Sequence, residues 1–461
     1  MRVLIVGGGG REHALAWKFK HDDPSVEILA APGNPGIAEL GECVAISATD
    51  VHSLASLAGE RAVDLTVVGP EAPLAAGIVD HFRAAGLAIF GPTRAAAEIE
   101  TSKAFAKRLM LDDGIPTARA EVHTEVASAS ACAHRFGAPV VIKASGLAAG
   151  KGVIVCQTLA EADSAIADIL EGNRFGNAGA EVLVEEFMEG EELSVFAITD
   201  GVQAVILPGL QDHKRLCNND IGPNTGGMGA YLPVSLPDAD RSDSGAADHS
   251  ISLRLAISQQ IIEPTLAGLR RRGRPFTGLL YAGLMLTRDG PKVVEFNCRF
   301  GDPETQALMP ALELEPSLLQ IMALATSESG FGGPPVTQPA PSTGSAGLGP
   351  AGKDVQASLA GACVTTVLAA ANYPDKPRTG DPIELPPISD DGVVVFHAGT
   401  ARDAQGRLVT AGGRVFAVSA LAPDIETAHD LSLAYARRIH FEGRQLRTDI
   451  AWREIARQKR R

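Results

Sequence analysis

Four short apolar segments, each followed by a loop rich in glycine and proline, dominate the first hundred residues. The segments between them carry apolar residues at helical spacing, as in residues 51–61 and 74–85. Strand, turn and helix repeated in this order predict a parallel, doubly wound sheet, in which ligands bind at the carboxyl ends of the strands. All four loops fall at those ends. The predicted strands are residues 3–6, 27–31, 64–68 and 87–90.

Beyond residue 101 the strands and helices alternate without this repeat. Residues 327–352 are dense in Gly, Pro, Ser and Thr and almost free of charge, which favours a flexible linker. Strands at 362–370, 393–397 and 414–420 and a helix at 425–439 then predict a small α+β domain. We therefore expect a parallel-sheet substrate domain at residues 1–102, a second domain at 103–326, a linker at 327–355 and a C-terminal domain at 356–461.

Composition and charge narrow the possible functions of this 461-residue chain. Lys and Arg number 41 against 55 Asp and Glu, so the formal net charge is −14, which makes general binding to nucleic acid or anionic membrane unfavourable. Six scattered cysteines form no C-x-x-C pair and favour free thiols in a reducing compartment. No stretch approaches the ~20 apolar residues of a membrane helix. We expect a cytoplasmic monomer that acts on small molecules.

The first loop follows a strand, opens a helix and reads G-G-G-G-R-E-H. Backbone N–H groups at a helix N-terminus favour an anion. The match to G-x-G-x-x-G is poor, because Arg11 and Glu12 stand where pyrophosphate needs small residues. A single phosphate at Gly9 and Gly10 fits better, and a tight structural turn is the alternative.

A second glycine-rich segment, residues 140–153, reads V-V-I-K-A-S-G-L-A-A-G-K-G-V. Lys143 ends a predicted strand and Lys151 lies on the loop that leads into the next one. No G-K-[ST] opens a helix, so the loop is not a Walker A motif. The arrangement predicts a flexible flap over a triphosphate, with lysines acting as point charges on phosphate. The alternative is an ordinary hairpin with exposed lysines.

Two further segments carry carboxylates. Residues 182–192 form an apolar strand followed by five glutamates; we expect the backbone at 186–188 to pair with an adenine edge and a nearby carboxylate to hold ribose, whereas Glu189 and Glu191 are solvated.

In residues 292–304, Glu295 and Asn297 are two apart on a strand and share one face, and Arg299 continues the spacing. Hard oxygen ligands of this kind suit Mg²⁺ beside nucleotide phosphates, and Arg299 suits a carboxylate or acyl phosphate.

Residues 211–231 read as a long Gly/Asn/Pro loop after a strand, containing Q-D-H-K-R and G-P-N-T-G-G-M-G-A-Y. Asp212 and Lys214 supply charges, and Gly226 and Gly227 allow backbone N–H groups to face a ligand. Taken alone, this segment is ambiguous between a substrate loop and a surface Ω-loop.

Together these motifs resemble the phosphoribosylamine–glycine ligases (glycinamide ribonucleotide synthetases) of the ATP-grasp superfamily, over nearly the whole chain. The resemblance rests on G-G-R-E-H-A-L at residues 9–15, V-G-P-E-A-P-L at 68–74, G-L-A-A-G-K-G-V at 146–153, the two motifs in 211–231, and E-F-N-C-R-F-G-D-P-E-T-Q at 295–306. It implies an N-terminal pre-ATP-grasp sheet domain, a central ATP-grasp domain with a lid at about residues 122–190, and a C-terminal domain. The implied reaction is ATP + glycine + 5-phosphoribosylamine → ADP + phosphate + glycinamide ribonucleotide, a step of purine biosynthesis.

The resemblance also implies roles for individual residues. Asp212 and Arg299 would orient glycine and its phosphorylated form, and Glu295 and Asn297 would bind Mg²⁺ or Mn²⁺. ATP would contact Lys103, Lys143, Gly150, Lys151, Gly152, Glu185, Glu186, Phe187 and Glu192. The other substrates would contact Gly9, Gly10, Arg11, Glu12, Lys214, Asn224, Thr225, Gly226, Gly227 and Met228.

Two departures accompany the resemblance. Ser145 stands where the family usually has Asp, and the strand at 280–284 lacks the second metal carboxylate of many ATP-grasp enzymes. Three other functions stay open: a different ATP-grasp carboxylate–amine ligase or biotin-carboxylase-like enzyme, a nicotinamide-dependent dehydrogenase argued from the first loop alone, and a nucleotide-binding regulator without turnover.

Overall fold

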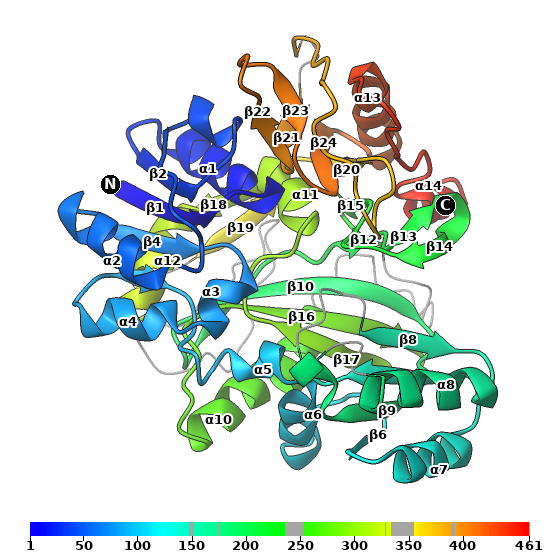
Figure 1. The fold of residues 1–461 in the computed structure, drawn as a ribbon. Coiled ribbons are helices and arrows are strands. Elements are labelled where there is room, and N and C mark those ends of the chain that lie inside the picture. Colours follow the sequence, from blue (N-terminus) through cyan, green and yellow to red (C-terminus); the bar gives the residue numbers. More distant parts are fainter. Residues whose placement is uncertain are drawn as a thin grey trace.

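The computed structural model shows three globular parts around a central antiparallel sheet (Figure 1). It describes residues 1–146, 152–172, 176–235, 253–327, 329–332, 355–388 and 392–460. Gly150 and Lys151, two of the predicted nucleotide ligands, lie outside the described residues. In this part of the chain, no helix has both the length and the apolar character needed to cross a membrane.

The N-terminal part is the predicted doubly wound sheet, with five parallel strands in the order β3-β2-β1-β4-β5. Alternate residues of β1 face opposite layers: Val3 and Ile5 pack on the α1 side, and Leu4 and Val6 on the α2 and α4 side. The helix predicted over 74–85 is broken, because Gly77 adopts φ +86° between α3 and α4. The elements are β1 (Arg2–Gly7), α1 (Gly10–Asp22), β2 (Glu27–Pro32), β3 (Glu42–Cys43), α2 (Val51–Glu60), β4 (Leu65–Val68), α3 (Glu71–Ala75), α4 (Ile78–Ala84) and β5 (Ile89–Phe90).

The centre of the molecule is a four-stranded sheet in the order β11-β10-β16-β17, which crosses the middle of the view in Figure 1. Its strands are antiparallel, and their inward residues form one core with α6 and α10. Two short helices, α5 and α6, lead from the N-terminal sheet to this layer. The bounds are α5 (Glu98–Thr101), α6 (Lys103–Asp112), β10 (Glu191–Thr199), β11 (Ala204–Ile206), α10 (Glu263–Arg271), β16 (Gly278–Thr287) and β17 (Gly290–Asn297).

A smaller sheet with its own core forms the lid subdomain, at the lower right of Figure 1. Its strands run in the order β6-β9-β7-β8, and α7 and α8 cover one face. The covered face carries apolar residues such as Ile142 and Val184, whereas Lys143 and Glu185 lie on the opposite face. The elements are β6 (Ala120–His123), α7 (Val126–Phe136), β7 (Val140–Ala144), β8 (Val153–Cys156), α8 (Leu159–Leu170) and β9 (Val182–Glu186).

The C-terminal sheet contains two strands that come from the middle of the sequence. Its order is β12-β15-β20-β24-β21, so the interpretation of residues 211–231 as one long loop is wrong. Tyr231 is buried in a core with Val364 and Ile450, and this burial holds β15 in the sheet despite the glycines around it. The elements are β12 (Gln211–Asp212), β13 (Arg215–Cys217), β14 (Ile221–Asn224), β15 (Gly229–Leu232), β20 (Ala362–Ala369), β21 (Val393–His397), β22 (Thr400–Arg402), β23 (Leu408–Thr410), β24 (Arg414–Ala422), α13 (Ile425–Arg438) and α14 (Trp452–Gln458).

The segment before the predicted linker ties the three parts together. Residues of α11 and α12 share one core with α1 and β20, and β18 pairs with β19 on the far side of the linker. Phe331, inside the predicted linker, is buried, and its N–H donates to Asp200 Oδ2 at 2.9 Å. The part of the linker at 329–332 is therefore attached to the domain; residues 333–354 lie outside the described residues. The bounds are α11 (Glu304–Ala311), β18 (Leu312–Glu315), α12 (Leu318–Thr326) and β19 (Gln356–Leu359).

Candidate active site

The loop between β17 and α11, residues 298–303, meets all three parts of the molecule. Arg299 lies 3.4 Å from Glu71 of α3 and 3.3 Å from Glu100 of α5. The carbonyl of Phe300 accepts a hydrogen bond from Arg11 at 3.1 Å, and Asp302 pairs with Arg414 of β24 at 3.4 Å. One short loop therefore presents charged groups to a junction of three domains.

Arg299 is held by two carboxylates, Glu71 and Glu100, whose pKa values shift in opposite directions. Burial opposes ionisation of Glu71, but Arg299, a backbone hydrogen bond and Arg11 together lower its pKa. For Glu100, burial dominates and raises the pKa, although its Oε2 accepts from the Cys298 N–H at 2.7 Å. Arg299 also donates to Asn297 Oδ1 at 3.4 Å. The guanidinium is thus fixed in position beside the predicted metal ligands and keeps its charge.

Glu295 and Asn297 are the predicted metal ligands, and both lie at the end of β17. Glu295 is paired with Gly283 of β16, where an added Cβ would lie 3.3 Å from Glu295 Cγ. The glycine thus leaves room for the Glu295 side chain. Burial opposes ionisation of Glu295, but Lys214, Lys143 and Lys103 lower its pKa. The carboxylate is therefore ionised among lysines.

Lysines from the lid sheet and α6 converge on one buried carboxylate, Glu185. Lys143 Nζ lies 2.8 Å from Glu185 Oε2 and Lys107 Nζ lies 3.2 Å from Oε1. Lys143 Nζ also donates to the Val294 carbonyl of β17 at 3.2 Å, which joins the lid to the central sheet. Lys103 donates to the Gly146 carbonyl at 3.1 Å, and burial lowers its pKa. The side chain of Glu185 is thus engaged by lysines.

The remaining predicted nucleotide contacts lie around the end of β9. Glu186 accepts from the Arg119 N–H at 2.9 Å, Phe187 is exposed, and Glu192 forms an ion pair with Lys214. The Gly152 carbonyl accepts from the Ala144 N–H at 2.8 Å, at the end of the β7–β8 pair. Residues 147–151, which connect the two strands, lie outside the described residues.

Asp212 and Lys214, at the edge of the C-terminal sheet, act electrostatically on each other. Burial raises the pKa of Asp212 in spite of Lys214, and Glu304 and Glu192 act in the same direction. Burial opposes the charge of Lys214, but Asp212 and Glu192 raise its pKa well above the usual value. Nearby, the hydroxyl of Tyr281 donates to Glu304 Oε1 at 2.8 Å. Asp212 and Lys214 therefore lie near Glu192 and Glu304, and Lys214 also acts on Glu295.

Glycines of the first loop, together with Gly69 after β4, make room for the Glu12 side chain. Its Oε2 accepts from the Gly9 N–H at 2.6 Å, and its Oε1 accepts from Arg11 Nε at 2.6 Å. An added Cβ on Gly69 would lie 1.9 Å from Glu12 Oε1, and one on Gly10 would lie 2.5 Å from Gln306 Nε2. Glycine at positions 10 and 69 allows the chain to pack closely on its neighbours. The Glu12 carboxylate is occupied by hydrogen bonds from its own loop.

The Asn224–Met228 segment is more constrained than the sequence suggested. Gly226 N–H donates to the Tyr373 hydroxyl at 2.9 Å, and Gly227 N–H donates to Thr225 Oγ1 at 3.0 Å. An added Cβ on Gly227 would lie 2.4 Å from Pro303. Both amides thus have protein partners, and the glycines allow contact with the 298–303 loop. Asn224 is exposed on β14, and Met228 is buried.

Several residues of this junction were not singled out from the sequence. Glu71 belongs to a motif that carried the family resemblance, and Glu100 precedes Lys103 by three positions, so both had a local signal. Lys107 lies one helical turn after Lys103, which places it on the same face of α6. Arg414 has no local signal, because only the fold of the C-terminal sheet brings it to Asp302 and to the Gly226 carbonyl at 2.6 Å.

Comparisons with known proteins agree with this geometry. Family models described as the N domain, the ATP-grasp (A) domain and the C domain of phosphoribosylglycinamide synthetase match residues 1–100, 101–305 and 363–453. The chain is 46% identical to the phosphoribosylamine–glycine ligase of Xanthomonas axonopodis pv. citri, over 100% of this chain and 99% of that protein. The Caulobacter vibrioides protein of the same name is 44% identical over 99% of both chains.

Solved structures show the same architecture. A phosphoribosylamine–glycine ligase from Thermotoga maritima has a TM-score of 0.77 at 32% identity, covering 97% of this chain and all of that one. A biotin carboxylase from Campylobacter jejuni has a TM-score of 0.70 at 14% identity, with 96% of this chain and 92% of that one covered, and shows a shared fold alone. The chain therefore belongs to the phosphoribosylglycinamide synthetase family of ATP-grasp enzymes.

Proposed function

We propose that this chain ligates glycine to 5-phosphoribosylamine at the expense of ATP, giving glycinamide ribonucleotide, ADP and phosphate in purine biosynthesis. Full-length identity to phosphoribosylamine–glycine ligases supports the reaction. The single observation that carries the assignment of the site is the meeting of Lys143 with β17, 3.2 Å from the Val294 carbonyl, next to Glu295. Lysines for a triphosphate and oxygen ligands for a cation thus lie together.

The nucleotide would lie between the lid sheet and the central sheet. Lys103 and Lys143 contact its phosphates, together with Gly150, Lys151 and Gly152 of the glycine-rich loop. The backbone at Glu185, Glu186 and Phe187 contacts adenine, and Glu192 contacts the ribose. The side chain of Glu185 has a different task in this proposal, because it is paired with Lys143 and Lys107 and positions them.

Glu295 and Asn297 fit a hard divalent cation. One ionised carboxylate and one amide oxygen, on a strand end beside lysines that bind phosphate, form the donor set that Mg²⁺ or Mn²⁺ uses with nucleotides. When bound, the ion offsets the charge of the transferring phosphoryl group. The neighbouring strand at residues 280–284 carries no carboxylate, which favours a site with few protein ligands.

Arg299 and Asp212 would act on the amino acid. A guanidinium binds a carboxylate through two parallel hydrogen bonds, so Arg299 orients glycine and then stabilises its acyl phosphate. Glu71 and Glu100 hold Arg299 in that position. Phosphorylation turns an unreactive carboxylate into glycyl phosphate, whose phosphate leaves when the amine of phosphoribosylamine attacks the carbonyl carbon. The lid excludes water, which would otherwise hydrolyse the acyl phosphate.

The sugar phosphate would lie at the three-domain junction. Gly9, Gly10, Arg11 and Glu12 border it on one side. Lys214 and the segment Asn224, Thr225, Gly226, Gly227 and Met228 border it on the other.

Release of ADP against a panel of acids and amines tests the proposal. We expect ADP formation only when glycine and phosphoribosylamine are both present, and formation of one glycinamide ribonucleotide for each ADP. ADP formation that depends on bicarbonate would overturn the assignment and favour the biotin carboxylases that share the fold. Binding of ATP without turnover on any pair would instead favour a regulator.

A further inference from the structure

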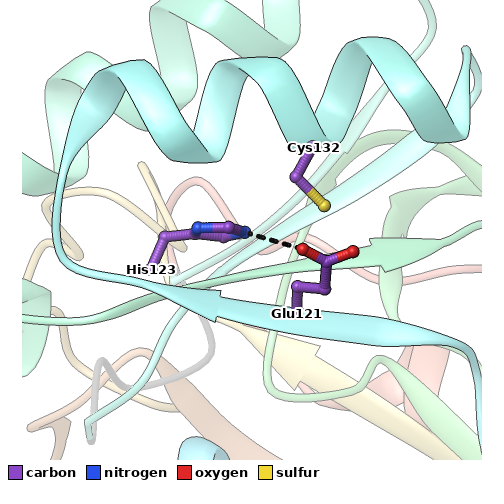
Figure 2. A group of neighbouring side chains, drawn as sticks. All are labelled: Glu121, His123 and Cys132. Atoms are coloured by element: carbon purple, nitrogen blue, oxygen red, sulfur yellow. Dashed lines mark ion pairs between the residues drawn. The ribbon is translucent and has the colours of Figure 1, made fainter.

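Three side chains with metal-ligating atoms meet on the helix-covered face of the lid sheet. Glu121 and His123 are two residues apart on β6, so their side chains lie on the same face. Both point toward Cys132 of α7 (Figure 2). A carboxylate oxygen, an imidazole nitrogen and the thiol sulfur all lie within 4.8 Å of one another. His123 Nε2 is 3.6 Å from Glu121 Oε2. Tetrahedral bonds of about 2.0–2.2 Å place neighbouring N and O ligands about 3.4 Å apart, so this spacing suits a shared ion.

This cluster lies apart from the proposed active site. Glu121 is paired across the sheet with Val184, which packs under α7 and α8. Lys143 and Glu185 occupy the opposite face of the same sheet. Because the sheet separates the two groups, the proposed reaction does not use the cluster, and an inference about it stands independently of that reaction.

The hydrogen bonds of His123 leave Nε2 as the free ligand atom. Its Nδ1 lies 3.1 Å from Ser128 Oγ, and that hydroxyl donates its hydrogen to the Glu125 carbonyl at 3.0 Å. When Ser128 accepts from Nδ1–H, the neutral imidazole has its lone pair on Nε2, the tautomer that binds a metal through Nε2. Within the described residues Nε2 is buried and has no hydrogen-bond partner. Nε2 faces the Glu121 carboxylate across 3.6 Å, and a cation between the two atoms would bind both.

Cys132 and Glu121 supply the charge that a divalent ion needs. Burial and the neighbouring Glu121 raise the pKa of the Cys132 thiol to about 11, so a bound metal must displace its proton. The exchange is Cys–SH + M²⁺ → Cys–S–M⁺ + H⁺, and the Glu121 carboxylate balances the remaining charge. Arg135 donates to both Glu121 oxygens, at 2.8 and 2.7 Å, but each oxygen keeps a second lone pair.

We propose that Glu121, His123 and Cys132 form a binding site for Zn²⁺ or a similar borderline-soft divalent ion. Sulfur and imidazole ligands favour such ions over Mg²⁺, whose ligands are oxygens. Water completes the tetrahedron, because the Glu121 side chain is 43% exposed. Ser128 is the residue that orients the imidazole. The bound ion links β6 to α7 and so stiffens the lid subdomain.

Titration of the full chain with Co²⁺ in excess Mg²⁺ tests this site, because Mg²⁺ fills oxygen sites without competing for the thiolate. We expect one equivalent of Co²⁺ to give a thiolate-to-cobalt charge-transfer absorption that Zn²⁺ abolishes by displacement. Since one proton is released, the affinity rises about tenfold per pH unit below the thiol pKa. Cys132→Ser removes the absorption, and His123→Gln and Glu121→Gln each weaken binding about tenfold or more.

Cys156→Ser is the matched control. Cys156 lies on β8 in the same core, and burial likewise raises its pKa to about 11, yet it lies outside the Glu121–His123–Cys132 group. This variant should bind Co²⁺ like the unaltered chain. Glu121→Gln, at a partly exposed position, keeps the test valid should Cys132→Ser fail to fold. No thiolate absorption, absorption that persists in Cys132→Ser, or equal binding by all variants would each overturn the proposal, the last as an adventitious ion only.

Discussion

Lys143 and Glu185, on neighbouring strands of the lid sheet, form a buried ion pair of 2.8 Å that faces the central sheet. Lys107 binds the other oxygen of the same carboxylate at 3.2 Å. Burial alone would raise the pKa of Glu185, but the two lysines lower it. Lys143, which we assign to the ATP phosphates, is therefore positioned by the Glu185 carboxylate.

Glu185→Gln tests this positioning. The amide keeps the shape but removes a charge-assisted hydrogen bond, which is worth about 1.5–3 kcal/mol. We expect kcat/KM for ATP to fall about 10- to 100-fold, mainly through KM, in steady-state assays. Glu171→Gln is the control, because Glu171 is exposed at the end of α8, on the helix-covered side of the lid sheet. Equal losses in both variants would contradict a specific role for Glu185.

Glu295→Gln tests the proposed metal site. Removing the ionised ligand should lower kcat/KM about 10²- to 10³-fold and raise the Mg²⁺ concentration needed for half-maximal velocity. Initial rates across a Mg²⁺ series measure both effects. Glu313→Gln, on the exposed side of β18, should leave the Mg²⁺ dependence unchanged. Near-normal turnover of Glu295→Gln at low Mg²⁺ would exclude Glu295 as a ligand.

Two glycine substitutions should change stability in opposite directions. In Gly69→Ala the new Cβ would lie 1.9 Å from Glu12 Oε1, so the carboxylate must move and the free energy of unfolding should fall by about 1–3 kcal/mol. Gly59 lies in α2 with no atom of the described residues within 4 Å of an added Cβ. Gly59→Ala should raise stability by about 0.5–1 kcal/mol. Denaturant midpoints measure both, and a destabilising Gly59→Ala would contradict the assignment of open space.

Arg414→Met tests the contact between the C-terminal sheet and the 298–303 loop. Asp302 would lose its ion-pair partner and keep the hydrogen bond from Gln306 at 2.7 Å. Breaking an ion pair costs about 3–5 kcal/mol at a fully buried site. Both side chains are about one-fifth exposed, so we expect about 2 kcal/mol. A double-mutant cycle with Asp302→Asn, read from denaturant midpoints, should give a coupling energy above about 0.5 kcal/mol. Strict additivity would mean that the ion pair contributes nothing.

A buried histidine pair between α1 and β21 predicts a pH dependence of stability. Burial lowers the pKa of His13 to about 3 and that of His397 to about 4, and His13 Nδ1 accepts from the His397 N–H at 2.9 Å. Between these values and about 6.5 the unfolded chain binds more protons. Stability is thus fully present above pH about 6.5 and should fall below it by about 1.4 kcal/mol per pH unit for each histidine.

The variant His13→Gln should flatten this dependence, because one of the two titrating groups is removed. Unfolding free energies measured at a series of pH values give the slope. His21→Gln, at the exposed end of the same helix, should keep the slope of the unaltered chain. An unchanged slope in His13→Gln would show that other groups cause the dependence.

Most helices and strands were predictable from short stretches of sequence, because the spacing of apolar residues and the positions of Gly and Pro are local properties. Helices α2 and α13 and strands β1 and β21 all lie within one residue of the predicted bounds. The pairing of β15 with β20 was not predictable in this way, because it joins segments far apart in the sequence. The glycines at 226–229 indicate a loop locally, whereas burial of Tyr231 decides the outcome.

In the candidate site, too, local sequence predicted some features, whereas others depend on contacts between distant segments. Alternation along β17 correctly puts Glu295 and Asn297 at one strand end. The partners of Arg299 and Asp302 come from α3, α5 and β24, and only the tertiary fold brings them there. The face on which Glu185 lies depends on the register between β7 and β9, which the sequence of either strand alone does not specify.

Because β15 is an internal strand of the C-terminal sheet, the chain's folding units do not coincide with its linear domains. A fragment that stops before β19 would keep β12 and β15 but expose the backbone edge that β20 covers. The missing piece would in turn lack its outermost pair of strands. Two such halves, produced as separate polypeptides, therefore carry complementary edges, and the natural place to divide this chain yields fragments suited to reassembly by strand pairing.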